Sequence, residues 1–118
     1  GFVFGCVGGK AFNRRKEAGE IAEKYADFVV ITELDPGMED INKICGEILS
    51  YIDHKEKAEI ITDRDTAVYT ALKKAEGMEN CVLVLAGGSD AYMKRGNKVY
   101  PSDTDGERVQ KFLKKIGK

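Results

Sequence analysis

The sequence predicts an α/β protein built on an open, doubly wound, mostly parallel sheet with a short antiparallel edge hairpin. Two observations support this prediction. Short apolar runs alternate along the chain with segments whose apolar residues recur at helical spacing. The runs contain few polar residues, which is typical of strands that are buried on both faces of a parallel sheet with helices on either side.

The first half of the chain contains two strand–helix units. The apolar run from Phe2 to Cys6 predicts a strand, and Arg14 to Tyr25 places apolar residues on one face of a helix. A second apolar run predicts a strand from Phe28 to Thr32. The segment from Glu39 to Ile52 then has apolar residues at helical spacing along its whole length.

A third strand is expected from Glu59 to Thr62, followed by a third helix. Either Asp63 or Asp65 can cap that helix, because a carboxylate accepts hydrogen bonds from the free N–H groups of a first turn. Gly77 is a typical helix end. The apolar run from Cys81 to Ala86 predicts a fourth strand.

The C-terminal part is expected to contain a hairpin and one helix. Strands from Ala91 to Lys94 and from Lys98 to Tyr100 would pair around the turn residues Arg95-Gly96-Asn97. The last helix is expected from Asp105 to Ile116, since its apolar residues again share one face. The hairpin is expected to form the antiparallel edge of the sheet.

Length and charge exclude several classes of protein. The 118 residues fit one compact domain, and a net charge of −1 lacks the basic surface of a general nucleic-acid-binding protein. No signal peptide or membrane-spanning run is recognisable, so we expect a cytoplasmic protein with no nucleic-acid or membrane partner.

Cys6, Cys45 and Cys81 lack the spacing of a metal site and are interpreted as free buried thiols. His54 lies in a polar segment and is interpreted as a surface loop residue.

Three loops follow predicted strands at the carboxyl edge of the sheet, where open α/β folds bind their ligands. They span residues 5–15, 32–39 and 87–92. The first carries Lys10, Arg14 and Arg15, which could bind a carboxylate or a phosphate. Its glycines match neither the dinucleotide fingerprint nor the ATP phosphate loop. A tight turn with solvated charges explains this loop equally well.

The second and third loops also leave two interpretations open. Asp35 could accept hydrogen bonds from a ligand amine, but Asp-Pro-Gly is also a common turn sequence, and the turn is favoured. Gly87 and Gly88 allow a ligand to approach the backbone, and Ser89 and Asp90 add polar groups. No histidine lies within motif range of Ser89 to activate it, and a strand-to-hairpin turn is the alternative.

The loops and the segments between them resemble one protein family. The stretch FGCVGG and the later RRKEAGEIAEKYADFVVIT are the most specific part, and Asp35-Pro36, ITDRDTAVYTAL and VLVLAGGSDAY continue it. Over nearly the whole chain the sequence is similar to the C-terminal domain of the Mur ligases. It is closest to the members that add the third residue of the peptidoglycan peptide. The resemblance implies a Rossmann-like fold.

What the resemblance implies about activity concerns a longer protein. Mur ligases are three-domain enzymes that form an amide bond through an acyl phosphate, and their C-terminal domain helps to bind nucleotide and incoming amino acid. We therefore expect residues 1–118 to be such a domain from a longer UDP-N-acetylmuramoyl-peptide ligase, inactive in isolation. Its partners would be the N-terminal and central domains of the same chain, the UDP-N-acetylmuramoyl-peptide and an amino acid. ATP and Mg²⁺ would serve the full-length enzyme without binding tightly to this domain.

Five residues stand at positions of the family's ligand contacts. By the resemblance, Lys10, Asp35, Gly88 and Asp90 are the substrate-binding residues, and Arg15 is the nucleotide-binding residue. Only Gly88 and Arg15 keep the residue type of the family. No catalytic and no metal-binding residue is expected in this domain.

Gly37 departs clearly from the family pattern. The diaminopimelate-adding enzymes have an arginine there, in the motif D-N-P-R, which binds the distal carboxylate of diaminopimelate. Glycine has no side chain for this contact, so recognition of meso-diaminopimelate by that clamp is not expected. The altered loops do not identify the amino acid that is added.

Two alternative hypotheses accompany the ligase prediction. The first is a non-catalytic paralogue domain that serves as a binding or assembly module. The second is a dinucleotide oxidoreductase in which Glu33 would be the acidic residue after the second strand. The glycine spacing of the first loop argues against the oxidoreductase.

Overall fold

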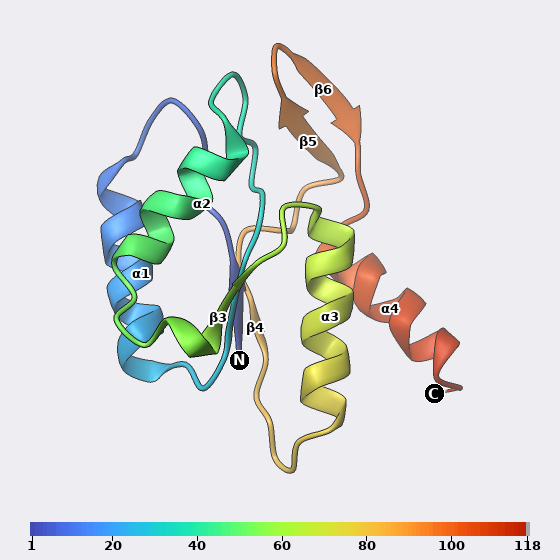
Figure 1. Ribbon diagram of the computed structural model, residues 1–118. Helices are drawn as coiled ribbons and strands as arrows, with labels where there is room; N and C mark the ends of the chain where they lie inside the picture. Colours follow the sequence, from blue (N-terminus) through green and yellow to red (C-terminus); the bar gives the residue numbers. More distant parts are fainter. Residues whose placement is uncertain (118) are drawn as a thin grey trace.

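The computed structural model describes residues 1–117 and shows a four-stranded parallel sheet between two layers of helices (Figure 1). The strand order is β3-β2-β1-β4, so the chain starts in the middle of the sheet and winds outward in both directions. The strands are β1 (Phe2–Phe4), β2 (Val29–Ile31), β3 (Ala58–Ile60) and β4 (Val84–Leu85). This arrangement confirms the predicted doubly wound α/β class.

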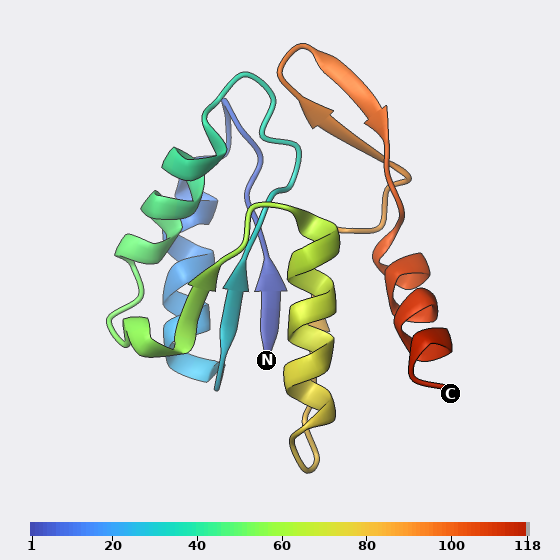
Figure 2. The ribbon, with the colours of Figure 1, turned by 45° about the vertical axis from the view of Figure 1, so that its right-hand side comes forward.

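Helices cover both faces of the sheet. Helices α1 (Asn13–Tyr25) and α2 (Ile41–Ser50) pack together on one face, and α3 (Arg64–Glu76) lies on the other. Helix α4 (Asp105–Lys115) packs against α3 on its outer side (Figure 2). A short 3₁₀ turn, η1 (Lys55–Lys57), leads into β3.

Side-chain alternation along the strands divides the apolar core in two. Phe4, Val29 and Ile31 face the cluster formed with α1 and α2. Val3 and Val30 face the cluster formed with α3. Both faces of β2 are therefore buried, which explains why its sequence is apolar throughout rather than alternating.

Local hydrogen bonds start three of the four helices. Asp40 caps α2 by accepting from the Asn42 N–H at 2.9 Å, and Asp63 caps α3 by accepting from the Thr66 N–H at 2.9 Å. The choice between Asp63 and Asp65 is thus settled in favour of Asp63. Helix α4 begins with a reciprocal capping box between Thr104 and Glu107.

The predicted hairpin forms, but it is a separate two-stranded sheet of β5 (Tyr92–Arg95) and β6 (Lys98–Pro101). It stands above the carboxyl ends of the strands, beside the loop that precedes α2 (Figures 1 and 2). Backbone bonds hold it there: the Gly37 N–H donates to the Lys94 carbonyl at 3.1 Å, and the Gly96 N–H donates to the Gly37 carbonyl at 2.6 Å. These bonds to a loop replace the expected pairing with the edge of the main sheet.

The fourth strand is shorter and more exposed than its sequence suggested. Pairing with β1 covers only Val84 and Leu85, and Val82 and Val84 are 76% and 50% exposed. The reason is position, because β4 is an edge strand and receives neighbours on one side only.

The three cysteines are free, as predicted, but they are not all buried. Cys6 and Cys45 are buried as expected, whereas Cys81 is half-buried.

Candidate functional site

The loops after β1, β2 and β4 pack against one another at the carboxyl edge of the sheet. The Gly8 N–H donates to the Asp35 carbonyl at 3.1 Å. A Cβ on Gly8 would lie 1.7 Å from the Pro36 carbonyl oxygen, so only glycine fits at this contact. The first two loops therefore meet with no side chain between them at this point, and Gly87 of the third loop lies against the Leu34 side chain of the second.

An open cleft of about 420 Å³ lies between the second loop, the start of α3 and the hairpin. Its lining combines backbone from the 36–37 turn with four charged side chains from three segments: the second loop, the start of α3 and the hairpin. The lining residues are Glu33, Pro36, Gly37, Glu39, Ile41, Thr62, Asp63, Arg95 and Gly96. The cleft is large enough for part of a small polar ligand.

Glu33 and Arg95 form a bidentate ion pair in this cleft. Arg95 Nε and Nη2 each donate to one carboxylate oxygen of Glu33 at 2.7 Å. Glu33 is only 5% exposed, and its Oε2 also accepts from the Arg64 N–H at 3.1 Å. The carboxylate raises the pKa of the Arg95 guanidinium, so the guanidinium stays charged at neutral pH.

A buried arginine, Arg15, holds Glu39, which lines the cleft just before α2. Arg15 is 1% exposed and donates to both oxygens of Glu39, at 2.7 and 2.8 Å, and to Glu47 at 2.7 Å. Glu39 also accepts from the Gly9 N–H at 2.8 Å. These donors, Arg15 first, lower the pKa of Glu39 to about 2, which keeps it ionised well into the acid range.

Asp35 holds the hairpin in place. Its backbone has φ of +44°, its N–H donates to the Met93 sulfur at 3.2 Å, and its Oδ1 accepts from the Lys94 N–H at 2.8 Å. The chain does turn after Asp35, since the Glu39 N–H donates to the Pro36 carbonyl at 3.2 Å and Gly37 has φ of +59°. The Asp35 carboxylate, however, binds the hairpin instead of capping this turn. Binding of a ligand amine by Asp35 stays a prediction.

Gly88 packs against a buried network of charges. The Asp105 N–H donates to the Gly88 carbonyl at 2.7 Å, and a Cβ on Gly88 would lie 2.1 Å from the Asp105 carboxylate. Arg64, itself 1% exposed, donates to both oxygens of Asp105 at 3.1 and 2.7 Å and to the carbonyls of Glu33 and Ala86. Burial opposes ionisation of Asp105, but the arginine contacts outweigh it and lower the pKa.

The five predicted site residues do not share one cavity. Asp35, Gly88 and Asp90 line a hollow of about 10 Å³, which holds at most about one water molecule. Lys10 is exposed in the loop that precedes α1, and Arg15 points into its ion pairs. Their assignment as ligand contacts stays a prediction.

The cleft is lined by charged residues that the sequence did not assign to the ligase site. Glu33 and Asp63 follow β2 and β3 closely, and this position was their signal; Glu33 was considered only for the oxidoreductase. Glu39 precedes α2, and the sequence predicted it as the start of that helix. Arg95 carried no signal, because a hairpin residue reaches the cleft only through the docking of the hairpin on Gly37.

Two candidate phosphate contacts of the first loop are paired within the chain. The Gly9 N–H and the Arg15 guanidinium, which would be the natural phosphate contacts of the first loop, are both used by Glu39. Within residues 1–117 there is no cluster of His, Cys, Asp and Glu suited to a metal ion. None of the helices in that range is long and apolar enough to span a bilayer.

Comparison with known proteins identifies a family. The family model described as Mur ligase, glutamate ligase domain, matches residues 2–88. The UDP-N-acetylmuramyl-tripeptide synthetase of Ligilactobacillus salivarius is 42% identical over 107 residues, which cover 87% of this chain and 21% of that protein. The L-lysine-adding UDP-N-acetylmuramoyl-L-alanyl-D-glutamate ligase of Enterococcus faecalis is 32% identical over 113 residues, covering 96% of this chain and 22% of that protein.

A solved structure has the same fold. The structure of a UDP-N-acetylmuramoyl-L-alanyl-D-glutamate–2,6-diaminopimelate ligase superposes on 99% of this chain with a TM-score of 0.85 and 25% sequence identity. The superposition covers 24% of that protein. The chain therefore spans about a fifth of the length of the curated relatives that it matches.

Proposed function

Because the chain belongs to the Mur ligase family, in its glutamate ligase domain, we propose that it is the amino-acid-binding part of an ATP-dependent UDP-N-acetylmuramoyl-peptide ligase of the peptidoglycan pathway. The cleft at the carboxyl edge supports this proposal most strongly. It brings the Glu33–Arg95 pair and Asp63 to one opening of about 420 Å³. Such a mixture of charges suits a ligand with an ammonium and a carboxylate group.

The proposed division of labour assigns binding and orientation to this chain. ATP and Mg²⁺, bound elsewhere in the full-length enzyme, would activate the carboxyl group of the UDP-linked peptide as an acyl phosphate. The residues of the cleft would hold the incoming amino acid so that its amine faces the activated carbon. Positioning of this kind removes much of the entropic cost of a two-substrate reaction. The reaction would take place in the cytoplasm, with the other domains of the same chain as partners.

The predicted contact residues enter this proposal with different supporting geometry. Lys10, exposed in the first loop, is available to an anionic group of the peptide substrate. Asp90 is exposed at the end of the third loop and Gly88 is half-buried beside it. Asp35 and Arg15 would act through the loops that they hold, since their side chains are used internally. Nucleotide contact by Arg15 would require Glu39 to move away.

Altered amino-acid specificity is part of the proposal. Gly37 has φ of +59° and no side chain, so the second loop supplies backbone rather than an arginine to the cleft. The alternative is a non-catalytic paralogue domain, used for binding or assembly. The internal use of Arg15 and Asp35 favours that alternative, because two predicted ligand contacts are already occupied. Membership of the Mur ligase family replaces the dinucleotide oxidoreductase as an explanation of the fold.

Amino-acid-dependent phosphate release by the full-length natural chain tests the proposal. The protein would receive ATP, Mg²⁺ and UDP-N-acetylmuramoyl-dipeptide, and phosphate would be measured across a panel of amino acids. Release that depends on one amino acid supports a ligase and names its substrate. Folded protein that releases no phosphate with any amino acid supports the non-catalytic alternative. An Asp90→Ala variant then tests the role of Asp90. The substitution raises the KM of a substrate if Asp90 contacts that substrate, and leaves the KM unchanged if it does not.

A further inference from the structure

We propose that Arg95, supplied by the hairpin, is the specificity-determining residue that binds a carboxylate of the incoming amino acid. The inference rests on the proposed function and names the group that recognises the substrate. Its ligand would be a zwitterionic amino-acid end, with the carboxylate on Arg95 and the ammonium near Asp63. Both residues line the open cleft at the carboxyl edge.

The backbone fixes the position of Arg95. The hydrogen bonds from Gly37 to Lys94 and from Gly96 to Gly37, at 3.1 and 2.6 Å, flank Arg95 on both sides. The Lys94 N–H is also held by Asp35 Oδ1 at 2.8 Å. The guanidinium therefore enters the cleft from a point that is tied to the second loop, beside a glycine whose missing side chain leaves the space open.

The Glu33 pair orients Arg95 without using all of its donors. A guanidinium has five N–H donors arranged in a plane. Glu33 accepts from Nε and from Nη2, on one edge of that plane. The edge formed by Nη1 and the second Nη2 hydrogen has the geometry for another bidentate carboxylate. The Arg95 side chain is 45% exposed, so a ligand can reach it. The Glu33 side chain is only 6% exposed and therefore stays against Arg95.

The other charges of the cleft select the partner group. Glu33 is paired with Arg95 and Glu39 with Arg15. Among the lining residues described here, Asp63 has a carboxylate without an arginine partner, although Thr66 uses its Oδ2 in the helix cap. The cleft thus offers one cationic edge and one anionic group, which matches an amino-acid zwitterion better than a simple anion or a diamine.

Binding to the full-length chain tests the role of Arg95. Calorimetric titrations would use L-lysine, meso-diaminopimelate and 1,5-diaminopentane, in the presence of UDP-N-acetylmuramoyl-dipeptide and a non-hydrolysable ATP analogue. The wild type is expected to bind at least one of the two amino acids and not the diamine, which lacks a carboxylate. Arg95→Ala should weaken amino-acid binding by about ten- to a hundredfold, the loss expected for a charged, paired hydrogen bond. The affinity of Arg95→Lys for the amino acid should lie between those of the wild type and Arg95→Ala, because lysine keeps the positive charge but cannot donate two parallel hydrogen bonds.

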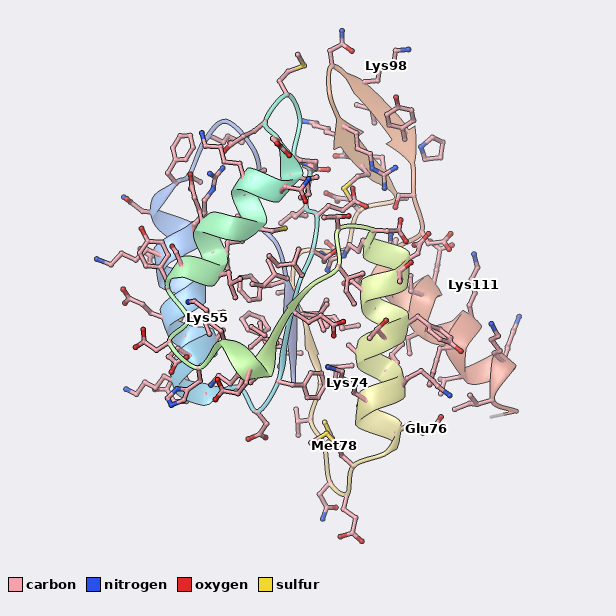
Figure 3. The ribbon with its side chains drawn as sticks, viewed as in Figure 1. Lys55, Lys74, Glu76, Met78, Lys98 and Lys111 are labelled. Carbon is pink, nitrogen blue, oxygen red and sulfur yellow. The ribbon has the colours of Figure 1, made fainter. Side chains whose placement is uncertain are left out.

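Lys98 provides the matched control. It pairs with Arg95 across the hairpin, but it lies at the tip of the hairpin and outside the cleft (Figure 3). Lys98→Ala removes the same charge and should leave the affinity within about twofold. The double variant Glu33→Gln/Arg95→Ala removes the buried carboxylate together with its partner. It therefore retains the test if Arg95→Ala alone unfolds the protein.

The two amino acids distinguish which carboxylate is bound. If Arg95 binds the α-carboxylate, Arg95→Ala weakens both ligands; if it binds a distal carboxylate, only meso-diaminopimelate is affected. Three outcomes would each overturn the inference. Arg95→Ala could bind the amino acids as tightly as the wild type, Lys98→Ala could lose as much affinity as Arg95→Ala, or the wild type could bind neither amino acid. Binding that depends on Arg95 without phosphate release would instead support Arg95 and contradict the ligase proposal.

Discussion

Val30 and Glu33 lie three residues apart on one segment, and both are buried, yet burial has opposite consequences for them. Val30 is 0% exposed in the apolar cluster against α3, where loss of contact with water is itself stabilising. Glu33 is 5% exposed, and an ionised carboxylate there is costly unless it is paired. Arg95 and the Arg64 N–H, both distant in sequence, provide that compensation.

The comparison separates two ways of organising a sheet. In the strands, each residue needs only an apolar neighbour of about the right size. At the carboxyl edge, each buried charge needs a specific partner at hydrogen-bond distance. Side chains at that edge therefore hold distant segments together, and a ligand can take part in the same contacts.

The largest effect is expected from Arg64→Ala. This change leaves the buried Asp105 carboxylate without two of its hydrogen bonds and the Ala86 carbonyl without its donor. Removing one partner of a buried ion pair costs about 3–5 kcal/mol of unfolding free energy. Urea denaturation would measure it, with the exposed Arg14→Ala as a control that changes stability by less than about 0.5 kcal/mol. A loss below about 1 kcal/mol for Arg64→Ala would show that the edge charges do not depend on pairing.

Two valines in the same sheet allow a direct test of the apolar side of the comparison. Val30→Ala should cost about 2 kcal/mol, because it leaves a cavity in a fully buried position. Val84→Ala, on the half-exposed edge strand, should cost less than about 1 kcal/mol. Denaturant melts of both variants would decide the matter. Similar losses at the two positions would mean that a further part of the protein covers β4.

The lowered pKa of Glu39 predicts that the protein loses stability in acid. The pKa of this carboxyl is about 2 when folded, against an ordinary value of 4.5, so its contribution is complete above about pH 4.5 and disappears as the pH falls towards 2. Glu39→Gln should cost about 1–2 kcal/mol at pH 7 and flatten the decline of stability between pH 4.5 and 2. Urea melts of wild type and variant at several pH values would measure both effects. A parallel decline in the two proteins would assign it to other carboxylates.

The smallest effect is expected for an exposed pair. His54 lies in the surface loop predicted for it and contacts Glu23, which raises its pKa above the ordinary value of 6.5. Since the charged form is favoured by folding, the contribution is present below pH 6.5 and is lost as the pH rises through the folded pKa. An NMR titration should show the pKa of His54 falling towards 6.5 in Glu23→Gln. An unchanged titration curve would mean that the pair does not persist in solution.

The sequence by itself determined the repeating part of the molecule. Apolar runs and helical spacing located the strands and helices to within a few residues, because burial on one or both faces is a local pattern. Local hydrogen-bonding chemistry likewise explains the caps at Asp63 and Thr104. The resemblance at the loops predicted the family, and the family model then matched.

Tertiary structure alone decided the partners of the buried charges. The pairs Arg15–Glu39, Arg64–Asp105 and Glu33–Arg95 join residues that lie 24 to 62 positions apart. Nothing in the spacing of such residues specifies a partner, since pairing depends on which loops meet once the sheet has formed. The docking of the hairpin on Gly37 has the same origin. It is this docking, rather than any motif, that brings Arg95 to the cleft.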